Sequence, residues 1–356
     1  MLRPRMLIPF LLFLIISPSA LSSVSISSFN IKHLGWGDSK DFPALAQVIS
    51  HFDLVAIQEV MSEDAVAKLA ETVSSGTGEK WRYMTSHLIG RGSYKEAYTM
   101  MWRDSAVEYV DGAVVFIDNR DKYAREPFSA RFREKATGLE FAVANVHILY
   151  GDSVSDRTPE IRALADYWQW LGEVYGDTPR LLMGDFNYAP DGDAWQPLKA
   201  LGAAPAITQG ATTLSPRDGR YANLYDNIWH TPGALPIAEA GILRFPDILG
   251  ISHEEARDTV SDHAPVYVVL EGGELNLSRA SSDSFDTSQA AANDSCIDLN
   301  RSNASTLAEL PHIGTARANR IIESRPWRDV RNLTNLNGIG NGRLGDILDS
   351  GLLCTG

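Results

Sequence analysis

Six short polar motifs stand where apolar runs end between residues 24 and 270, and their side chains have the chemistry to hydrolyse a phosphate ester. The motif residues are Asn30, Glu59, His147, Asp185 with Asn187, Asp226, and Asp262 with His263. Carboxylate and amide oxygens suit Mg²⁺ or Ca²⁺ better than zinc. The histidines and the remaining carboxylates can transfer protons and stabilise a transition state. Hydrolysis of a phosphodiester requires both kinds of group.

Each motif also has a simpler explanation when it is taken alone. Asp185 and Asn187 could be turn residues, and Asp262 could cap a turn. His147 could be a buried core histidine. Six such motifs in one domain favour a shared site instead, because α/β sheets hold their ligands at the ends of strands.

The chain that must position these residues alternates between strand-like and helix-like segments from residue 24 onward. Strands are predicted at residues 24–31, 53–57, 100–102, 113–117, 141–146, 181–183 and 266–270. Helices are predicted at residues 42–52, 62–73 and 158–175, and Thr158-Pro159 is expected to open the last of these. Such mixing predicts one α/β domain over residues 24–270.

Composition indicates a folded chain of 356 residues, for which about two domains are expected. Apolar residues make up 44% and charged residues 22%, which excludes wholesale disorder and a fibrous class. Two cysteines exclude a disulfide scaffold and a cysteine-rich zinc module. The formal net charge is −13. Because binding depends on local patches rather than on total charge, this value does not exclude a nucleic-acid partner.

The N-terminus has the pattern of a secretory signal peptide over residues 1–22. Arg3 and Arg5 precede an apolar run at residues 6–16, and small residues follow it. The run is shorter than the roughly 20 residues that span a bilayer. We therefore expect a secreted or periplasmic protein with no stable membrane association after cleavage, and a monomer.

Composition changes at residue 271. Residues 271–295 are rich in Ser, Asp and Ala, which predicts a flexible linker. Residues 296–356 form a compact segment with two related turns, at 310–314 and 336–340, that lie 26 residues apart. Cys296 and Cys354 bracket this segment, and a disulfide between them would stabilise it by about 4 kcal/mol in the chain-entropy model. The segment carries seven arginines and six acidic residues, so it is the part of the chain that repels a polyanion least.

The ordered motifs of the first domain resemble those of the endonuclease/exonuclease/phosphatase superfamily over residues 24–270. They are Phe-Asn30-Ile, Gln-Glu59-Val, Val-His147, Gly-Asp185-Phe-Asn187, Tyr-Asp226 and Ser-Asp262-His263-Ala-Pro. Residues 93–98 (Ser-Tyr-Lys-Glu-Ala-Tyr) and 125–127 (Arg-Glu-Pro) resemble the deoxyribonuclease I branch in particular. The resemblance implies a four-layer α/β sandwich of two mixed sheets, with the site at one edge.

The same resemblance implies a set of metal ligands. Glu59, with Asn30 and Asp262, would hold Mg²⁺ and/or Ca²⁺, and Mn²⁺ would also suit these ligands. Asp185 and Asn187 would bind the phosphate and the water shell of the metal. An in-line attack on a phosphate needs such positive charge together with positioned donors.

Two acid–base pairs and two DNA contacts are implied as well. His263, oriented by Asp226, would activate the attacking water. His147, paired with Glu96, would stabilise or protonate the leaving oxygen. The DNA backbone would be contacted by Tyr94 and Arg125. The branch carries a groove-reading arginine two residues after the glutamate, where this chain has Met61.

The C-terminal segment resembles helix-hairpin-helix DNA-binding modules of the competence-protein type. The resemblance lies in residues 297–300 (Ile-Asp-Leu-Asn), 310–314 (Leu-Pro-His-Ile-Gly) and 338–340 (Gly-Ile-Gly). The implied contacts to DNA phosphates are Ile313, Gly314, Gly338, Ile339 and Gly340. A glycine-rich hairpin lets backbone N–H groups at a helix start approach phosphates closely. His312 replaces the usual first glycine of one hairpin. A protein-interaction or structural module is the alternative.

The sequence therefore predicts a secreted, divalent-metal-dependent deoxyribonuclease, of the endonuclease type, with a tethered DNA-binding module. Two alternatives stay open. One is a phosphodiesterase acting on lipids or other phosphate esters. The other is a DNA-binding or DNA-uptake protein whose nuclease fold is inactive. RNA as a further substrate is not decided by the sequence.

Overall fold

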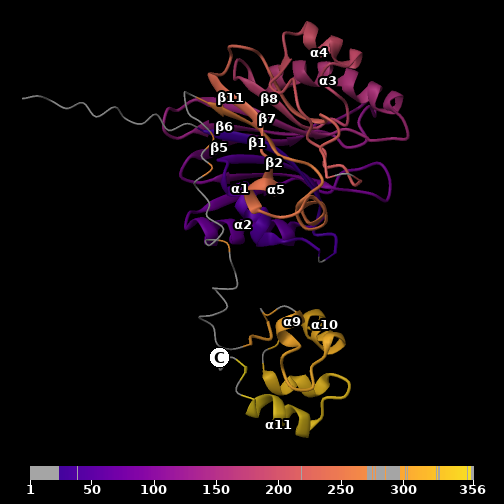
Figure 1. Ribbon diagram of the computed structural model, residues 1–356. Coiled ribbons are helices and arrows are strands. Elements are labelled where there is room, and N and C mark those ends of the chain that lie inside the picture. Colours follow the sequence, from indigo (N-terminus) through magenta and orange to yellow (C-terminus); the bar gives the residue numbers. More distant parts are fainter. Residues whose placement is uncertain are drawn as a thin grey trace, which may run out of the picture. The chain divides into compact units, whose positions relative to one another are not determined.

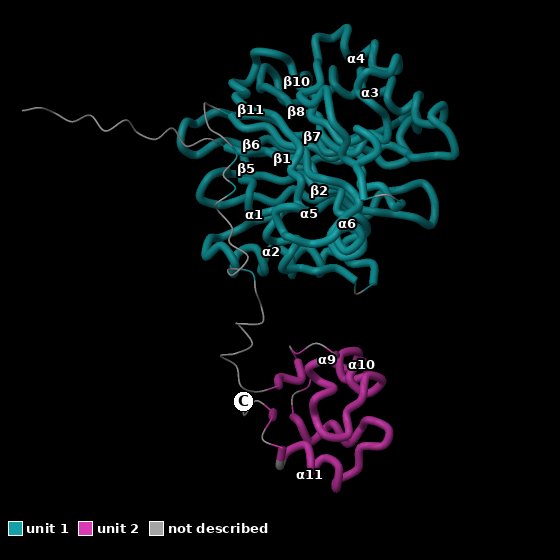
Figure 2. Tube along the Cα trace, in the orientation of Figure 1, with its two compact units in different colours: residues 1–285 teal, residues 286–356 magenta. Residues whose placement is uncertain are grey.

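A computed structural model describes two compact units, residues 1–285 and 286–356 (Figure 2). The described residues are 24–37, 39–217, 219–270, 275, 277, 285, 297–300, 302, 304–325, 327, 329–350 and 352–353. The predicted signal peptide at 1–22, most of the predicted linker, and both cysteines, Cys296 and Cys354, lie outside these residues. Among the described helices, none has the length and apolar character that would span a membrane.

Two six-stranded mixed sheets form the first unit (Figure 1). The first sheet runs in the order β11 (Ile237–Ile242), β12 (Val266–Leu270), β1 (Ser25–Leu34), β2 (Leu54–Val60), β4 (Ala97–Arg103) and β3 (Trp81–Thr85). The second runs in the order β5 (Val107–Val115), β6 (Phe128–Glu134), β7 (Glu140–His147), β8 (Arg180–Asp185), β10 (Asp226–His230) and β9 (Ala204–Pro205). Each sheet has one parallel pair, β1 with β2 and β7 with β8.

Helices cover the outer faces of both sheets, so the predicted four-layer α/β sandwich is confirmed. Helices α1 (Phe42–Ser50) and α2 (Glu63–Thr77) pack on the first sheet. Helices α3 (Val154–Tyr175) and α4 (Gln196–Ala200) pack on the second. Ile26, Leu54, Met100, Val143 and Met183 fill the space between the sheets. The central strands are buried on both faces, which explains their nearly continuous apolar sequence.

Shorter helical segments lie on the loops that lead back to β12. They are α5 (Phe245–Leu249), α6 (His253–Glu255) and a π-helical turn at Ala256–Val260, while a 3₁₀ turn at Asp193–Trp195 precedes α4. The chain from the π-helical turn continues directly into the Ser-Asp262-His263 motif. This loop therefore sets where the last polar motif meets the others.

The structure differs from the sequence prediction in several elements. Strands β3, β6, β9, β10 and β11 were not predicted. In β6 the apolar residues Phe128, Ala130 and Phe132 alternate with polar ones, a period-two pattern that the continuous apolar runs elsewhere outweigh. Helix α3 begins at Val154 and not at Thr158, because Ser153 and Asp156 form a capping box one turn earlier.

A buried polar contact joins the two sheets close to the polar motifs. Gln58 of β2 donates from Nε2 to Asn145 Oδ1 of β7 (2.6 Å), and Asn145 donates from Nδ2 to the carbonyl oxygens of Ile57 (3.0 Å) and Thr99 (3.3 Å). Gln58 and Asn145 are fully buried. Since a buried polar group without a partner costs free energy, this contact restricts how the sheets can slide past each other.

Two residues of the predicted linker contact the first unit. Phe285 is buried in the same apolar cluster as α1 and α2, and Leu275 packs against that cluster. The Leu275 backbone N–H also donates to Glu239 Oε2 (3.0 Å). The first unit therefore reaches at least to Phe285, while the domain boundaries at 270 and 296 stay predictions.

The second unit is a small helical module. Its elements are α9 (Ala304–Leu307), α10 (Thr315–Glu323), a 3₁₀ segment (Val330–Asn335) and α11 (Asn341–Asp349), packed around a core that includes Leu310, Ile321 and Ile347. Ile297 and Leu353 form a parallel β-bridge. These two residues adjoin the cysteines in sequence, so the fold is compatible with the predicted disulfide, which stays a prediction.

The inter-sheet contact predicts a stability effect. Asn145→Leu removes three buried hydrogen bonds, those with Gln58, Ile57 and Thr99, so it should lower the free energy of unfolding by about 3 kcal/mol. Urea unfolding followed by tryptophan fluorescence measures this, because seven of the eight tryptophans lie before residue 271. The exposed Asn119 provides a matched control, Asn119→Leu, for which a change within about 0.5 kcal/mol is expected. If both substitutions changed the free energy of unfolding equally, the contact between Gln58 and Asn145 would not stabilise the fold.

Candidate active site

The polar motifs come together at one edge of the sandwich because three of them share a row of the second sheet. His147 at the end of β7 pairs with Asp185 at the end of the parallel strand β8. Asp185 in turn pairs with Asp226, the first residue of the antiparallel strand β10. Asn30 and Glu59 reach the same edge from the first sheet. Register alone therefore places groups far apart in sequence beside one another.

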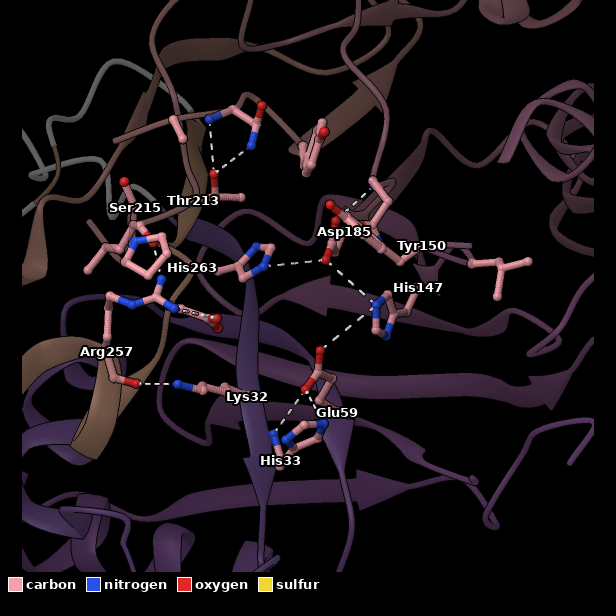
Figure 3. Close-up of a pocket in the computed structure, with 18 of the residues that line it drawn as sticks. Lys32, His33, Glu59, His147, Tyr150, Asp185, Thr213, Ser215, Arg257 and His263 are labelled. Carbon is pink, nitrogen blue, oxygen red and sulfur yellow. Dashed lines mark hydrogen bonds and ion pairs between the residues drawn. The ribbon is translucent and has the colours of Figure 1, made fainter. Parts of the chain in front are cut away.

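One oxygen of Asp185 lies close to three other side chains of the site. Asp185 Oδ2 accepts from Asn30 Nδ2 (3.1 Å) and lies 3.6 Å from His147 Nε2 and 3.7 Å from His263 Nε2. Figure 3 shows the carboxylate between the two rings. Its other oxygen, Oδ1, accepts the backbone N–H of Asn187 (2.9 Å). The side chain is only 2% exposed, so it is held firmly in place.

The close approach of β7 and β8 at this point requires a glycine. Gly184 has φ +153°, and a Cβ atom on it would lie 1.8 Å from the carbonyl oxygen of Val146. No other residue fits this position without moving the strands apart. The glycine of the Gly-Asp185 motif therefore determines the spacing between Asp185 and His147.

His147 is held from its other nitrogen by a buried carboxylate. His147 Nδ1 lies 2.6 Å from Glu96 Oε1, and the Tyr94 hydroxyl donates to Glu96 Oε2 (3.0 Å). Burial would raise the pKa of Glu96, yet the charges of His147 and Arg125 hold it below its ordinary value. Burial and Arg125 would lower the pKa of His147, but Glu96 and Asp185 raise it above its ordinary value.

His263 has an equivalent partner on the opposite side. Its Nδ1 lies 2.8 Å from Oδ2 of the fully buried Asp226. Burial would lower the pKa of His263, but the charges of Asp226 and Asp185 raise it well above its ordinary value. Each histidine is thus oriented at Nδ1 by a carboxylate and presents Nε2 toward Asp185 (Figure 3). This orientation leaves Nε2 free to exchange a proton with a bound group.

Asn30 and Glu59 bring the first sheet into the site. Asn30 Nδ2 donates to Glu59 Oε1 (2.9 Å), while Asn30 Oδ1 accepts the backbone N–H of Lys32 (3.0 Å). Glu59 Oε2 accepts the backbone N–H of His33 (3.1 Å). Glu59 has a left-handed φ of +60°. Such strained positions in non-glycine residues cluster at functional sites.

The carboxylates of the site fit a divalent cation. Among the described residues, one group has metal-ligand spacing, formed by Asp185, Asp226 and His263, whose ligand atoms all lie within 4.8 Å of one another. The buried Asp226 Oδ1 has no hydrogen-bond partner in the described part of the chain. Glu59 and Asp262 line the same cleft of about 540 Å³. Oxygen donors of this kind are what Mg²⁺ and Ca²⁺ prefer.

In the second unit, the two turns 26 residues apart are two equivalent hairpins. His312 (φ +64°) and Gly338 (φ +85°) occupy the same left-handed position. Gly314 and Gly340 then cap α10 and α11 with almost identical backbone angles. His312 adopts the conformation that favours glycine, and its Nε2 lies 2.6 Å from Asp346 Oδ2 on α11.

The arginines of the two hairpins match as well. Arg317 NH1 donates to the carbonyl of His312 (2.9 Å), and Arg343 NH1 donates to the carbonyl of Gly338 (2.7 Å). Each guanidinium thus lies beside the hairpin that starts its own helix. The repeat seen in the sequence is therefore a repeat of structure.

Each of the two units matches a known protein family or motif. The Endonuclease/Exonuclease/phosphatase family matches residues 27–263, and the Helix-hairpin-helix motif matches residues 292–347. The chain belongs to the endonuclease/exonuclease/phosphatase family. A protein named Deoxyribonuclease from Thioalkalivibrio sp. (strain K90mix) is 48% identical over 97% of this chain and 96% of its own length. Human Deoxyribonuclease-1 is 29% identical over 70% of this chain and 92% of its own length.

Solved structures support the fold of this family member. A mannosyl-6-phosphatase of Bacteroides thetaiotaomicron has a TM-score of 0.52 at 18% identity, over 70% of this chain and all of that one. A conserved protein of Enterococcus faecalis has a TM-score of 0.53 at 17% identity, with the same coverage. At this level of identity the likeness concerns the fold alone.

The predicted metal ligands lie around one cleft in the structure, but they do not form one compact group. Glu59 is linked to Asp185 through Asn30. Asp262 lies at another part of the cleft, where its Oδ2 is 3.5 Å from Arg257 NH2. Asn30 Nδ2 donates to the carboxylates of Glu59 and Asp185, and Asn30 Oδ1 accepts the backbone N–H of Lys32. The metal-ligand roles therefore stay predictions.

Tyr94 and Arg125, the two predicted DNA contacts, line the cleft and also help to hold His147 in place. Arg125 Nε donates to the His147 carbonyl (3.1 Å) and lies 3.5 Å from Glu96 Oε1. Tyr94 donates to the same glutamate. Desolvation and the neighbouring charge of Glu96 raise the pKa of the Tyr94 phenol far above its ordinary value. Both residues thus help to orient His147, whatever they contact in a complex.

Sequence reasoning missed several residues of the cleft. Lys32 and Arg257 line it, and Lys32 Nζ donates to the Arg257 carbonyl (2.6 Å). Lys32 could have been noticed, because it stands two residues after Asn30. Arg257 lies in the π-helical turn and Tyr150 on an irregular loop, and neither belongs to a motif, so nothing in the sequence distinguished them.

The His263–Asp226 pair predicts a measurable titration. In Asp226→Asn the negative charge is lost, so the pKa of His263 should fall toward or below its ordinary value. Histidine NMR titration of the metal-free protein measures this, with His263→Ala to assign the signal. Glu239→Gln removes a carboxylate that bonds Tyr267 instead, and should leave the pKa of His263 unchanged. An equal pKa in wild type and Asp226→Asn would show that the pair does not form in solution.

Proposed function

We propose that this chain is a secreted, divalent-metal-dependent deoxyribonuclease that cleaves DNA internally and holds it with a tethered helix-hairpin-helix module. The observation behind this proposal is the convergence of two carboxylate-oriented histidines on Asp185, in a cleft lined by further carboxylates. The names of the relatives, Deoxyribonuclease and Deoxyribonuclease-1, favour DNA as the substrate. Export is supported by the sequence pattern of residues 1–22.

The carboxylates have the role of holding the metal. Glu59, Asp185 and Asp262 would supply hard oxygen ligands, and Asn30 would hold two of these carboxylates in place. Mg²⁺, Ca²⁺ or Mn²⁺ suits such a set. When bound, the cation supplies positive charge to the scissile phosphate. Asn187, whose backbone N–H bonds Asp185, would help to bind that phosphate.

The two histidines have the role of moving protons. His263, oriented by Asp226, accepts the proton of the attacking water at Nε2 of the neutral ring. In the metal-free site Asp226 and Asp185 raise the pKa of His263, and the positive charge of a bound cation would lower it again and favour the neutral ring. His147, oriented by Glu96, donates a proton from Nε2 to the leaving oxygen, and its raised pKa favours the protonated ring. Both proton transfers would take place on opposite sides of one phosphate.

One assay tests the proposal as a whole. The purified mature chain is incubated with circular plasmid, linear duplex DNA, RNA and sphingomyelin, with Mg²⁺, Ca²⁺, Mn²⁺ or EDTA. Relaxation of the plasmid and cleavage of duplex DNA are expected with a divalent cation, and no cleavage with EDTA. Full nuclease activity in EDTA would contradict the metal mechanism. Hydrolysis of the lipid without cleavage of DNA would favour the other phosphodiesterase function.

A conservative substitution tests the metal ligand. Glu59→Gln keeps the shape of the side chain but removes its charge, so DNA cleavage should fall by orders of magnitude while the fold is retained. Circular dichroism and the urea midpoint check the fold. Glu108→Gln, which removes a half-buried carboxylate paired with Arg133 outside the cleft lining, should keep full activity. Cleavage by Glu59→Gln at the rate of this control would remove Glu59 from the metal site.

Removal of the second unit tests its role. A chain that ends at Phe285 keeps the buried Phe285 contact and loses both hairpins. Because a tethered second site raises the local concentration of DNA, its loss should raise KM on long duplex DNA and leave kcat unchanged. The difference should grow with substrate length and shrink as salt weakens the phosphate contacts. Equal kinetics of both chains on long DNA, at low and physiological salt, would favour a protein-interaction role for the module.

A further inference from the structure

We infer that the cleft accepts nucleic-acid strands whose bases are unpaired, and that Trp36 and Tyr150 are the platforms on which those bases stack. This inference rests on the proposed function and concerns the substrate class of the same site. It follows from two exposed aromatic rings beside the catalytic groups, from the way each is braced, and from the weak positive charge of the cleft.

Trp36 is exposed next to the Glu59 side of the cleft. It is 61% exposed, although large aromatic side chains are normally buried. Its ring lies 4.8 Å from the ring of His33 in an edge-on arrangement and 6.1 Å from the ring of Tyr94. His33 and Tyr94 both line the cleft, and His33 Nε2 lies 3.2 Å from Glu59 Oε2. Trp36, His33 and Tyr94 therefore form a group of neighbouring rings that reaches from the cleft lining to the exposed surface.

Tyr150 lies next to the His147 side of the cleft, where it forms part of the lining (Figure 3). It is 58% exposed, and the guanidinium of Arg157 lies 4.2 Å from its ring centroid. Arg157 is itself buried and donates to the carbonyls of Tyr150 (2.7 Å) and Asn187 (2.5 Å). A cation held in this way fixes the ring and leaves much of it open to a ligand.

The positive side chains of the cleft supply only part of the affinity for a nucleic-acid strand. Two cations of the cleft lie beside carboxylates, Arg125 beside Glu96 and Arg257 beside Asp262. Lys32 donates to a backbone carbonyl and keeps its positive charge. Duplex binding without base contacts depends on free cations at the phosphates. Because carboxylates offset two of these three charges, a further source of affinity at the cleft is needed.

Stacking supplies affinity that does not depend on free cations. In a duplex the faces of the bases are covered by their neighbours, and only edges and backbone are accessible. An unpaired base exposes its face, and its stacking on an aromatic side chain changes affinity by about five- to 150-fold per base, judged from alanine substitution. Trp36 lies beside His33 and Tyr94, and Tyr150 lines the cleft. Two such rings near the catalytic groups suit a strand that passes through the cleft with unpaired bases close to the scissile phosphate.

Substitution of the two rings tests the inference. The full-length chain carries Trp36→Ala or Tyr150→Ala, with Trp36→Phe and Tyr150→Phe as variants that keep a ring. Ile117→Ala serves as the control, because Ile117 is 76% exposed, more than either ring, and lies outside the cleft lining. The substrates are a single-stranded oligonucleotide and the fully paired duplex of the same sequence. Binding of fluorescent oligothymidine in EDTA gives a second readout that does not require catalysis.

Each alanine variant should lose about tenfold in kcat/KM on the single strand, through KM, and stay within about twofold of wild type on the duplex. Oligothymidine binding should weaken by the same factor at low and high salt, and the phenylalanine variants should recover most of it. Equal losses on both substrates, or none on either, would overturn the inference. So would loss of self-association with unchanged oligothymidine binding, because the rings would then contact a second copy of the chain. A wild type that binds oligothymidine through these rings but cleaves no nucleic acid would instead contradict the proposed function.

Discussion

The site depends on one buried carboxylate held between two histidines. Burial of the Asp185 carboxylate costs free energy that nearby positive or hydrogen-bonding groups must offset, and the Nε2 atoms of His147 and His263 lie 3.6 and 3.7 Å from its Oδ2. Each histidine needs its own carboxylate, Glu96 or Asp226, at the opposite nitrogen. Removal of any member leaves a buried charge unpaired, so these groups act as one unit.

The two sheets of the sandwich bring the polar groups of the site together at one edge. The second sheet places His147, Asp185 and Asp226 in a single cross-strand row, which no local segment could do. The first sheet adds Asn30 and Glu59, and the buried contact between Gln58 and Asn145 holds the two sheets in register beside them. Rigid strands thus fix the positions of the reacting groups, while the loops supply the groups that contact a substrate.

The sequence predicted the parts of this arrangement that are local. Polar residues directly after apolar runs could be found without a structure. The resemblance supplied the pairing of His147 with Glu96 and of His263 with Asp226. In the structure the histidine Nδ1 atoms lie 2.6 and 2.8 Å from the carboxylate oxygens of these partners. The strands missed by the prediction, such as β9 and β11, are short or alternate weakly. The stacking rings could not be predicted, because they depend on loop conformation and on contacts between residues distant in sequence.

A double-mutant cycle tests most directly the claim that both histidines act on one phosphate. The kcat of His147→Ala, His263→Ala and the double variant is measured on duplex DNA, after each fold is verified. Each single substitution should lower kcat by orders of magnitude, and the double variant should lose much less than the product of the two losses, since either change already disables the shared transition state. Losses that multiply fully would contradict the account, because the histidines would then act independently.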